Sequence, residues 1–220
     1  MKNVLLTILL LGGLMLLWTG CDDLSSNNLT DSEDDVSSDS LTDSRDGEIY
    51  ATVKINNQIW MAENLRYDTL GSWSNPDNPS AIYGRLYSWT IAQTACPNGW
   101  HLPSDAEWST LEVALGMNPS DSTTTVYGYR DTHGTGMKST TGWSRGNGTN
   151  TSGFNVFPAG NHISNGYSGW GNYAYFWSST ELGGTKTWAR YLGCGSAGVF
   201  RDLFDSTHKS FGFSCRCIKD

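Results

Sequence analysis

The sequence has little charge, and little of that charge is positive. Asp, Glu, Lys and Arg make up 16% of the 220 residues, well below the roughly 25% of an ordinary soluble domain. Lys and Arg number only 14 and the net charge is −8, which argues against nucleic-acid binding because that depends on clustered basic residues. Low charge combined with ten Trp, ten Tyr and 25 Gly excludes a coiled coil, an ordinary helical bundle and a wholly disordered chain.

The sequence also lacks the motifs of the common enzyme classes. It has no Ser/His/Asp order, no phosphate-binding glycine loop and no metalloprotease helix. The acid/base candidates in motif-like positions are His101, Glu107 and Glu181, and each has a structural explanation at a helix entry, in a capping box or at a turn. A soft-metal site at Cys215 and Cys217 lacks a second cluster with ligand spacing. We therefore expect no catalytic residue, no metal and no cofactor.

No apolar run is long enough to predict a membrane-spanning helix. Residues 4–18 are apolar apart from Thr7 and two glycines, a length typical of a signal-peptide core. We therefore expect a signal peptide over residues 1–20. The run ends in Leu16-Leu17-Trp18-Thr19-Gly20-Cys21, which resembles a bacterial lipoprotein box with Trp18 where an aliphatic residue is usual.

The lipoprotein box implies a lipid-anchored protein of the cell envelope. Cys21 would become the lipidated first residue, carrying palmitate or similar acyl chains that hold the protein to a membrane. The domain would then be extracytoplasmic, at the periplasmic face or the cell surface. The alternative is an ordinary secretory signal followed by a chance cysteine.

The negative charge is concentrated in residues 21–47. Residues 22–47 contain nine acidic residues and one basic residue, Arg45, so the remainder of the chain is nearly neutral. A Ser/Asp-rich segment of this kind buries too little apolar surface to fold and predicts a disordered tether. An acidic calcium-binding tract is the alternative, but the segment lacks the ligand spacing and glycine of a calcium loop.

Four cysteines remain when Cys21 is set aside, and an even number in an exported domain predicts two disulfides. Cys215 and Cys217 lie two residues apart in an alternating, strand-like segment. Their Cβ atoms would stand about 7 Å apart, too far for a disulfide, which needs about 3.5–4.5 Å. Each must reach a separate partner, which leaves two pairings. We favour Cys96–Cys217 with Cys194–Cys215.

Hydrophobic periodicity predicts an α+β domain over residues 48–220. Alternation predicts strands at 48–55 and 58–62 around a tight turn. We expect one helix over residues 83–94 and a second from a capping box formed by Ser104 and Glu107. Residues 117–153 are rich in Gly, Ser, Thr and Asn and predict long loops. Strands at both ends of the domain are expected to share a sheet, and the later strands are predicted at 154–157, 173–178, 187–192, 198–203 and 211–218.

Seven segments match the motifs of a known family in order, and they lie at residues 50–55, 58–65, 83–87, 96–108, 153–160, 176–181 and 216–218. Together they resemble the Fibrobacter succinogenes major paralogous domain over essentially all of residues 48–220. The resemblance implies a disulfide-bonded C-type-lectin-like fold with two helices and antiparallel sheets, and an exported or surface-attached bacterial protein. It implies no established activity. The chain departs from the family at Ser214-Cys215, where Val is usual, and that departure fits the added disulfide to Cys194.

The sequence lacks the motifs of the functions that are known for the implied fold. Calcium-dependent sugar-binding lectins use a Glu-Pro-Asn or Gln-Pro-Asp loop and a Trp-Asn-Asp strand, and neither stands at the corresponding place. The related formylglycine-generating enzymes use a pair of reactive cysteines, whereas the four cysteines here suffice for two structural bridges. The resemblance therefore favours a domain that is not an enzyme and does not depend on calcium.

A loop over residues 165–173 combines glycine, amide and aromatic side chains. Its candidate ligand-binding residues are Tyr167, Trp170, Asn172 and Tyr173, because flat rings beside amides suit stacking on sugars or a protein contact. The alternative is that Tyr167 and Trp170 fold back over the core. The remaining aromatic residues include five tryptophans that we assign to the core: Trp60, Trp89, Trp100, Trp108 and Trp177.

The sequence predicts a lipid-anchored, non-enzymatic binding module of the cell envelope. Its partners would be the membrane, through the anchor, and either a polysaccharide or a surface protein, through the loop aromatics. One alternative is a structural envelope scaffold with no dedicated ligand. A less favoured alternative is an enzyme related to the formylglycine-generating type.

Overall fold

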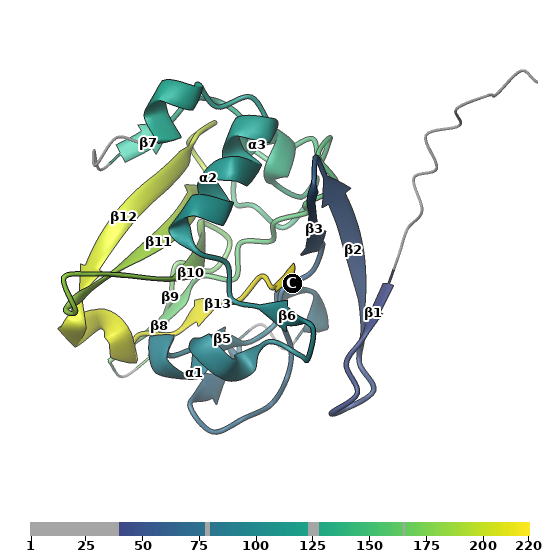
Figure 1. Cartoon of the computed structure of the whole chain (residues 1–220), viewed down its shortest axis with the longest axis vertical. Helices are drawn as coiled ribbons and strands as arrows, with labels where there is room; N and C mark the ends of the chain where they lie inside the picture. Colours follow the sequence, from purple (N-terminus) through teal and green to yellow (C-terminus); the bar gives the residue numbers. More distant parts are fainter. Residues whose placement is uncertain (1–39, 78–79, 123–127, 165) are drawn as a thin grey trace, which may run out of the picture. The chain divides into compact units, whose positions relative to one another are not determined.

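A computed structural model describes residues 40–220 apart from 78–79, 123–127 and 165 (Figure 1). The chain divides into two units, and the described residues belong to the one that spans Ser37–Asp220. The predicted signal peptide, Cys21 and residues 21–39 of the predicted tether lie outside the described residues. Among the described residues, no helix is both long and apolar enough to cross a membrane.

Three β-sheets account for most of the regular structure. The five-stranded sheet has the order β1 (Ser40–Thr42), β2 (Ile49–Ile55), β3 (Gln58–Met61), β14 (Ile218–Lys219) and β6 (Trp100–His101). The seven-stranded sheet has the order β4 (Ser72–Trp73), β5 (Leu86–Tyr87), β13 (Phe213–Ser214), β10 (Tyr173–Leu182), β11 (Lys186–Gly193), β12 (Val199–Asp205) and β7 (Gly128–Arg130). β8 (Asn161–Ile163) and β9 (Gly166–Ser168) form the third sheet.

The helices are few and short. They are α1 (Trp89–Ala95), α2 (Asp105–Ala114) and α3 (Gly134–Met137), with the 3-10 turns η1 (Ala81–Tyr83), η2 (Pro119–Ser122) and η3 (Ser206–Ser210). The predicted α+β class and the C-type-lectin-like fold are therefore wrong, because the described residues form a mostly β structure. The physical reason lies in strand pairing: Leu86 and Tyr87, predicted as helix, pair with β13, and this leaves only seven residues for α1.

The elements with strong local signals form where they are predicted. Ser104 and Glu107 make the capping box of α2, and β2 and β3 form a hairpin in which Asn56 has a φ of 53°. β14 pairs with both β3 and β6, so the two ends of the domain share a sheet as predicted. The predicted strand at 154–157 does not form, and the predicted strand at 211–218 is divided into β13 and β14.

β1 lies in the segment predicted as a disordered tether, which corrects the boundary at residue 47. Ser40–Thr42 pairs with β2, and the connecting turn buries Asp43 completely. The Arg45 Nε donates to Asp43 Oδ1 at 2.9 Å, and this hydrogen bond lowers the pKa of Asp43. The Arg45 guanidinium also lies 3.8 Å from the centre of the Tyr67 ring. This local ion pair lets an acidic turn pack against the domain despite its tether-like composition.

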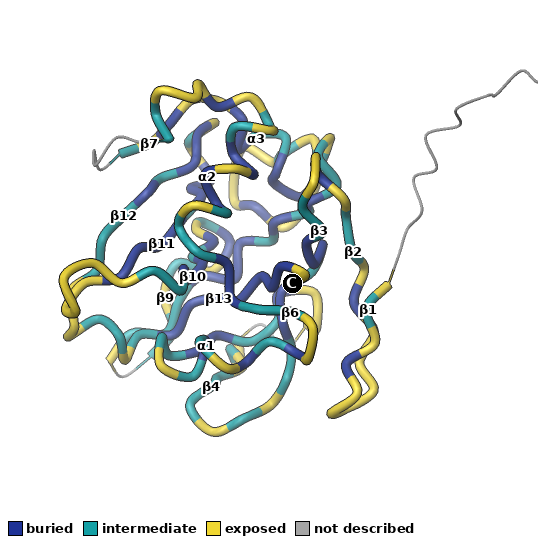
Figure 2. Tube along the Cα trace, in the orientation of Figure 1, coloured by how far each residue is buried: buried dark blue, intermediate teal, exposed yellow. Residues whose placement is uncertain are grey.

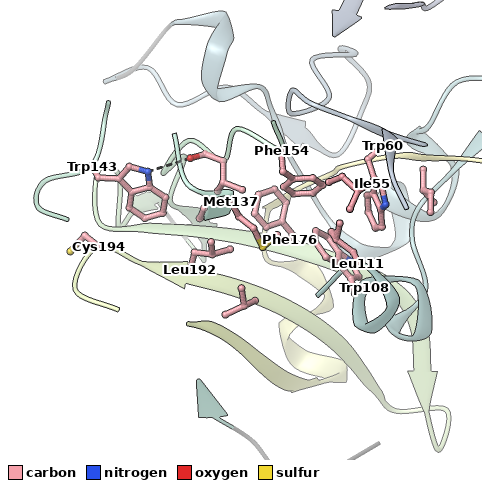
Figure 3. Packing of buried hydrophobic residues seen from close by; sticks show 14 residues of the cluster. Ile55, Trp60, Trp108, Leu111, Met137, Trp143, Phe154, Phe176, Leu192 and Cys194 are labelled. Carbon is pink, nitrogen blue, oxygen red and sulfur yellow. Dashed lines mark hydrogen bonds between the residues drawn. The ribbon is translucent and has the colours of Figure 1, made fainter. Parts of the chain in front are cut away.

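Two hydrophobic clusters form most of the core, and they coincide with the buried segments in Figure 2. In the first cluster, Trp60 lies 5.0 Å from Trp108 and 5.5 Å from Phe154 between ring centroids (Figure 3). In the second cluster, Trp177 stacks on Phe213 at 4.1 Å. The five tryptophans predicted as core all lie in or against these clusters, Trp60 and Trp108 in the first and Trp177, Trp89 and Trp100 in the second.

The cysteines form one disulfide in place of the two predicted. Cys96 and Cys217 are bonded, with Cα atoms 5.9 Å apart. Cys194 and Cys215 are free and buried, so the predicted second bridge is absent. Cys194 belongs to the first cluster and Cys215 to the second. Strand pairing places the two thiols in different parts of the core. An even number of cysteines therefore does not by itself mean that every cysteine is bonded.

Candidate functional site

The segment predicted as a binding loop, residues 165–173, contains β9 and the turn into the first residue of β10, and residue 165 lies outside the described residues. The described part is held closely by backbone contacts. Gly160 has a φ of +71°, and a Cβ there would lie 2.3 Å from the Ser168 carbonyl oxygen. The Gly171 amide donates to the Pro158 carbonyl at 3.0 Å, and the Tyr173 amide donates to the Gly169 carbonyl at 2.8 Å. The segment therefore packs along residues 158–160 and presents its side chains in fixed directions.

Tyr167 and Trp170 face different surroundings. Tyr167 packs against a small third hydrophobic cluster that includes Tyr83, and its ring centroid lies 5.1 Å from that of His162. Trp170 is 47% exposed and touches the core only at its edge, with its ring centroid 6.3 Å from that of Tyr83. Tyr167 thus covers a small apolar cluster, whereas Trp170 presents about half of its surface to solvent.

Asn172 and Tyr173 also lie in different surroundings. The Asn172 Nδ2 donates to the Trp170 carbonyl at 3.3 Å, and its Oδ1 accepts from the Cys194 thiol at 3.5 Å. Tyr173 is 39% exposed, and its ring lies 5.8 Å from Tyr175. The four predicted residues therefore do not converge on one site. Tyr173 instead belongs to a larger group of aromatic residues on the seven-stranded sheet.

We define the tyrosine face as the side of β7, β10, β11 and β12 that points away from the first cluster. Side chains alternate between the two sides of a strand, and the intervening residues Ala174, Phe176, Leu192 and Val199 lie in the first cluster. Figure 1 shows β10, β11 and β12 side by side. The name is used for five aromatic residues, Tyr129, Tyr173, Tyr175, Tyr191 and Phe200, whereas Trp177 and Phe204 further along the same side pack in the second cluster.

The rings of the tyrosine face touch one another across the strands. Tyr191 and Phe200, which are directly paired in register, stack with centroids 4.4 Å apart. Tyr175 lies 5.1 Å from Tyr191, and Tyr129 lies 5.1 Å from Phe200. A Cβ at Gly193 would lie 2.7 Å from the Tyr129 hydroxyl, so the missing side chain makes room for that ring. The result is a continuous aromatic surface in which Tyr129 is 46% exposed.

The hydroxyls of Tyr175 and Tyr191 stay protonated at neutral pH. Burial raises the pKa of Tyr175 to about 12, and the neighbouring Tyr173 and Tyr129 hydroxyls add to the shift. Burial also raises the pKa of Tyr191, with Tyr129 and Asp202 contributing. Neutral hydroxyls can both donate and accept hydrogen bonds. The tyrosine face therefore combines flat rings for stacking with hydroxyls that can bind other hydroxyls.

The acid/base candidates from the sequence each have a structural partner. His101 lies between two carboxylates, with its Nδ1 2.6 Å from Asp220 Oδ1 and its Nε2 2.9 Å from Glu107 Oε1. Glu107 also accepts from the Ser104 amide at 2.7 Å in the capping box. Glu181 on β10 forms an ion pair with Lys209 in η3. In the described part of the chain, no group of three or more His, Cys, Asp or Glu residues could hold a metal ion.

Sequence reasoning found Tyr173 but missed the other four aromatic residues of the tyrosine face. It searched for aromatic residues within one loop, whereas these residues come from four strands spread over residues 128–205. A weak signal exists in β10 and β12, where aromatic residues alternate with buried ones. Only the pairing of the strands shows that the rings meet.

The family model described as the Fibrobacter succinogenes major domain matches residues 53–219, which is nearly the whole described domain. No curated protein and no solved structure matches the chain significantly.

Proposed function

This chain belongs to the Fibrobacter succinogenes major domain family, and from that premise we propose that it is a non-enzymatic module of the cell envelope that binds a polysaccharide. The observation that carries the proposal is the tyrosine face. Tyr129 and Tyr173 are 46% and 39% exposed, and their rings are continuous with those of Tyr175, Tyr191 and Phe200. Contiguous exposed aromatic surface is uncommon on a soluble domain and marks an interaction site.

The chemistry of this surface fits a sugar chain. The faces of sugar rings are apolar and stack on aromatic rings, while their hydroxyls need hydrogen-bond partners at the edges. The tyrosine face offers both, because four of its five aromatic residues carry a hydroxyl. Engagement of His101, Glu107 and Glu181 by structural partners supports binding without catalysis.

The test measures binding of the purified full-length protein to an array of polysaccharides, with and without calcium. We expect calcium-independent binding, and we expect Tyr129→Ala with Tyr173→Ala to weaken it by about tenfold or more, because central aromatic residues dominate such contacts. The free energy of unfolding should fall by only about 1–3 kcal/mol, because the two rings are half-exposed and each aromatic pair contributes about 0.5–1.5 kcal/mol, so the variant should stay folded. Leu70→Ala is the control, because Leu70 is 93% exposed and lies outside the tyrosine face.

Other outcomes of that test discriminate between surfaces and partners. If Trp170→Ala alone removes binding while the tyrosine variants retain it, the β9–β10 loop is the site and the tyrosine face is not. If the protein binds no polysaccharide but retains one envelope protein in the same array, the surface-protein alternative replaces the proposal. If the protein binds neither a polysaccharide nor an envelope protein, the result favours a structural scaffold.

Anchoring through Cys21 is a second part of the proposal. It is supported by the lipoprotein-like sequence Leu16-Leu17-Trp18-Thr19-Gly20-Cys21, because several acyl chains on one residue hold a protein firmly to a membrane. We expect the protein to fractionate with membranes and Cys21→Ala to release it into the soluble fraction or leave its signal uncleaved. Cys194→Ala is the matched control and should not change fractionation. A soluble wild-type protein would contradict the anchor.

A further inference from the structure

The tyrosine side of the sheet carries two carboxylates, Asp202 and Glu181, and Glu181, which lies opposite Thr187, already has Lys209 as its ion-pair partner. Asp202 lies on β12 two residues after Phe200, and so on the same side of the sheet. The residues that form this side of β7, β10, β11 and β12 include no Lys or Arg. Asp202 is half-buried, and its Oδ1 accepts from the Leu203 amide at 2.8 Å. Within the described residues, no Lys or Arg forms an ion pair with Asp202.

Asp202 acts electrostatically on the rings beside it. Its partner across the strands is Ala189, a small residue, and the next pair along is Phe200 with Tyr191. Its negative charge helps to raise the pKa of both Tyr175 and Tyr191, after the larger effect of burial. The carboxylate is therefore close enough to affect charge at the centre of the tyrosine face.

Elsewhere in this domain, aromatic rings hold cations of the protein itself. Arg66 lies 4.3 Å from the Tyr50 ring centre, and Lys209 lies 4.2 Å from the Trp89 ring centre. Among the described residues, no ring of the tyrosine face has a Lys or Arg over it. Aromatic ring faces carry partial negative charge and attract cations. Phe200, two residues before Asp202, and Tyr191, diagonally across from it, therefore form with the carboxylate a surface that is complementary to a positive charge.

We propose that the tyrosine face selects polysaccharides that carry free amino groups, as in amino sugars without their acetyl groups. The inference rests on the proposed polysaccharide binding and names the ligand class. A protonated sugar amine would lie against Tyr191 and Phe200 with Asp202 as its counter-ion, while the rest of the sugar ring stacks on the neighbouring tyrosines. An acetylated amine or a hydroxyl at the same position carries no charge and gains neither interaction.

The test compares three probes of equal length and linkage on the full-length protein: oligosaccharides of glucosamine, of N-acetylglucosamine and of glucose. Binding is measured at a pH at which the free amines are protonated. We expect the glucosamine probe to bind about five- to tenfold more tightly than the other two, as a combined cation–ring and carboxylate interaction predicts. This preference should shrink as salt is raised, because salt screens charges near the surface.

Asp202→Asn removes the negative charge of the side chain and keeps nearly the same side-chain shape. Asn keeps an oxygen that can accept from the Leu203 amide, so the local backbone is preserved. We expect this variant to bind the glucosamine probe about fivefold more weakly and the glucose probe as the wild type does. Asp77→Asn is the matched control: it removes one exposed negative charge from the connection between β4 and η1, away from the tyrosine face.

The outcomes separate this inference from the proposed function. Equal binding of all three probes, or an equal loss for Asp77→Asn and Asp202→Asn, would overturn the selection for amines and leave polysaccharide binding intact. Binding of none of the probes, nor of any other polysaccharide, would overturn both. Tight binding of a lysine-rich peptide with no binding of the glucosamine probe would assign the surface to a cationic protein and also overturn the inference.

Discussion

Replacing Glu112 with Gln is expected to lower the free energy of unfolding by about 3–5 kcal/mol, the cost of leaving buried charges without their partner. Glu112 is fully buried on α2, and its Oε1 accepts from Arg190 Nε at 2.5 Å. Its Oε2 accepts from Arg130 at 2.5 Å and lies 3.3 Å from His133 Nε2. One carboxylate therefore neutralises two buried guanidinium groups that come from two different strands.

The effect is large because the arginines have few other ways to be neutralised. The Arg190 side chain is fully buried and that of Arg130 is 6% exposed. Asp105 also accepts from Arg190, at 2.7 Å, but it is shared with Arg201. A neutral amide at residue 112 could replace the hydrogen bonds only in part and could not replace the charge. Buried guanidinium groups would then lack compensation inside the core.

The loss of unfolding free energy in E112Q should be larger at neutral pH than in acid. Burial opposes ionisation of Glu112, but the charges of Arg190 and Arg130 and the nearby His133 imidazole hold its pKa below the usual value. A carboxyl group with a lowered folded pKa stabilises the fold above its unfolded pKa, about 4.3, and loses this contribution as the pH falls through the folded pKa. The difference between wild type and E112Q should therefore be full at neutral pH and shrink in acid.

The measurement is denaturant unfolding of the wild type and E112Q at several pH values. The control is Glu181→Gln, because Glu181 pairs with Lys209 near the surface and exposed ion pairs contribute about 1 kcal/mol or less. A loss for E112Q no larger than that of the control, or one that does not change in acid, would show that the cluster is neutralised by other groups.

Removing the Cys96–Cys217 disulfide with Cys96→Ala and Cys217→Ala is expected to cost about 4–5 kcal/mol, because the bridge spans 121 residues and restricts the unfolded chain strongly. The disulfide ties the end of α1 to the residue before β14, which pairs with both β3 and β6. Its loss should therefore also loosen the five-stranded sheet, which is seen as faster hydrogen exchange in β3 and β14.

Unfolding in urea compares this double variant with the wild type and with Cys194→Ala, which leaves the bridge intact. Thiol titration of the unfolded protein under non-reducing conditions gives a separate count. We expect two free thiols from Cys194 and Cys215, apart from any contribution of Cys21. No free thiol from this pair would restore the two-disulfide prediction, and a double variant as stable as Cys194→Ala would contradict the expected entropic effect.

Features written in neighbouring residues could be predicted from the sequence. The capping box needs only Ser104 and Glu107, three residues apart, and its two reciprocal hydrogen bonds form as soon as the helix starts. The β2–β3 hairpin needs two alternating segments and a turn at Asn56. The Cys96–Cys217 pairing followed partly from the geometry of a strand. These features depend on local spacing, which a sequence displays directly.

Tertiary structure alone decided the class of the fold, the state of the other two cysteines and the tyrosine face. Leu86 and Tyr87 fit a helical pattern but pair with β13, because the hydrogen bonds of a neighbouring strand outweigh weak helix propensity. Tyr175, Tyr191 and Phe200 meet because the register of β10, β11 and β12 sets them opposite one another. A shift of one residue in that register would turn a strand's rings to the other side of the sheet. Register depends on contacts between distant segments, so the sequence determined which side chains are available while strand pairing decided which of them form a surface.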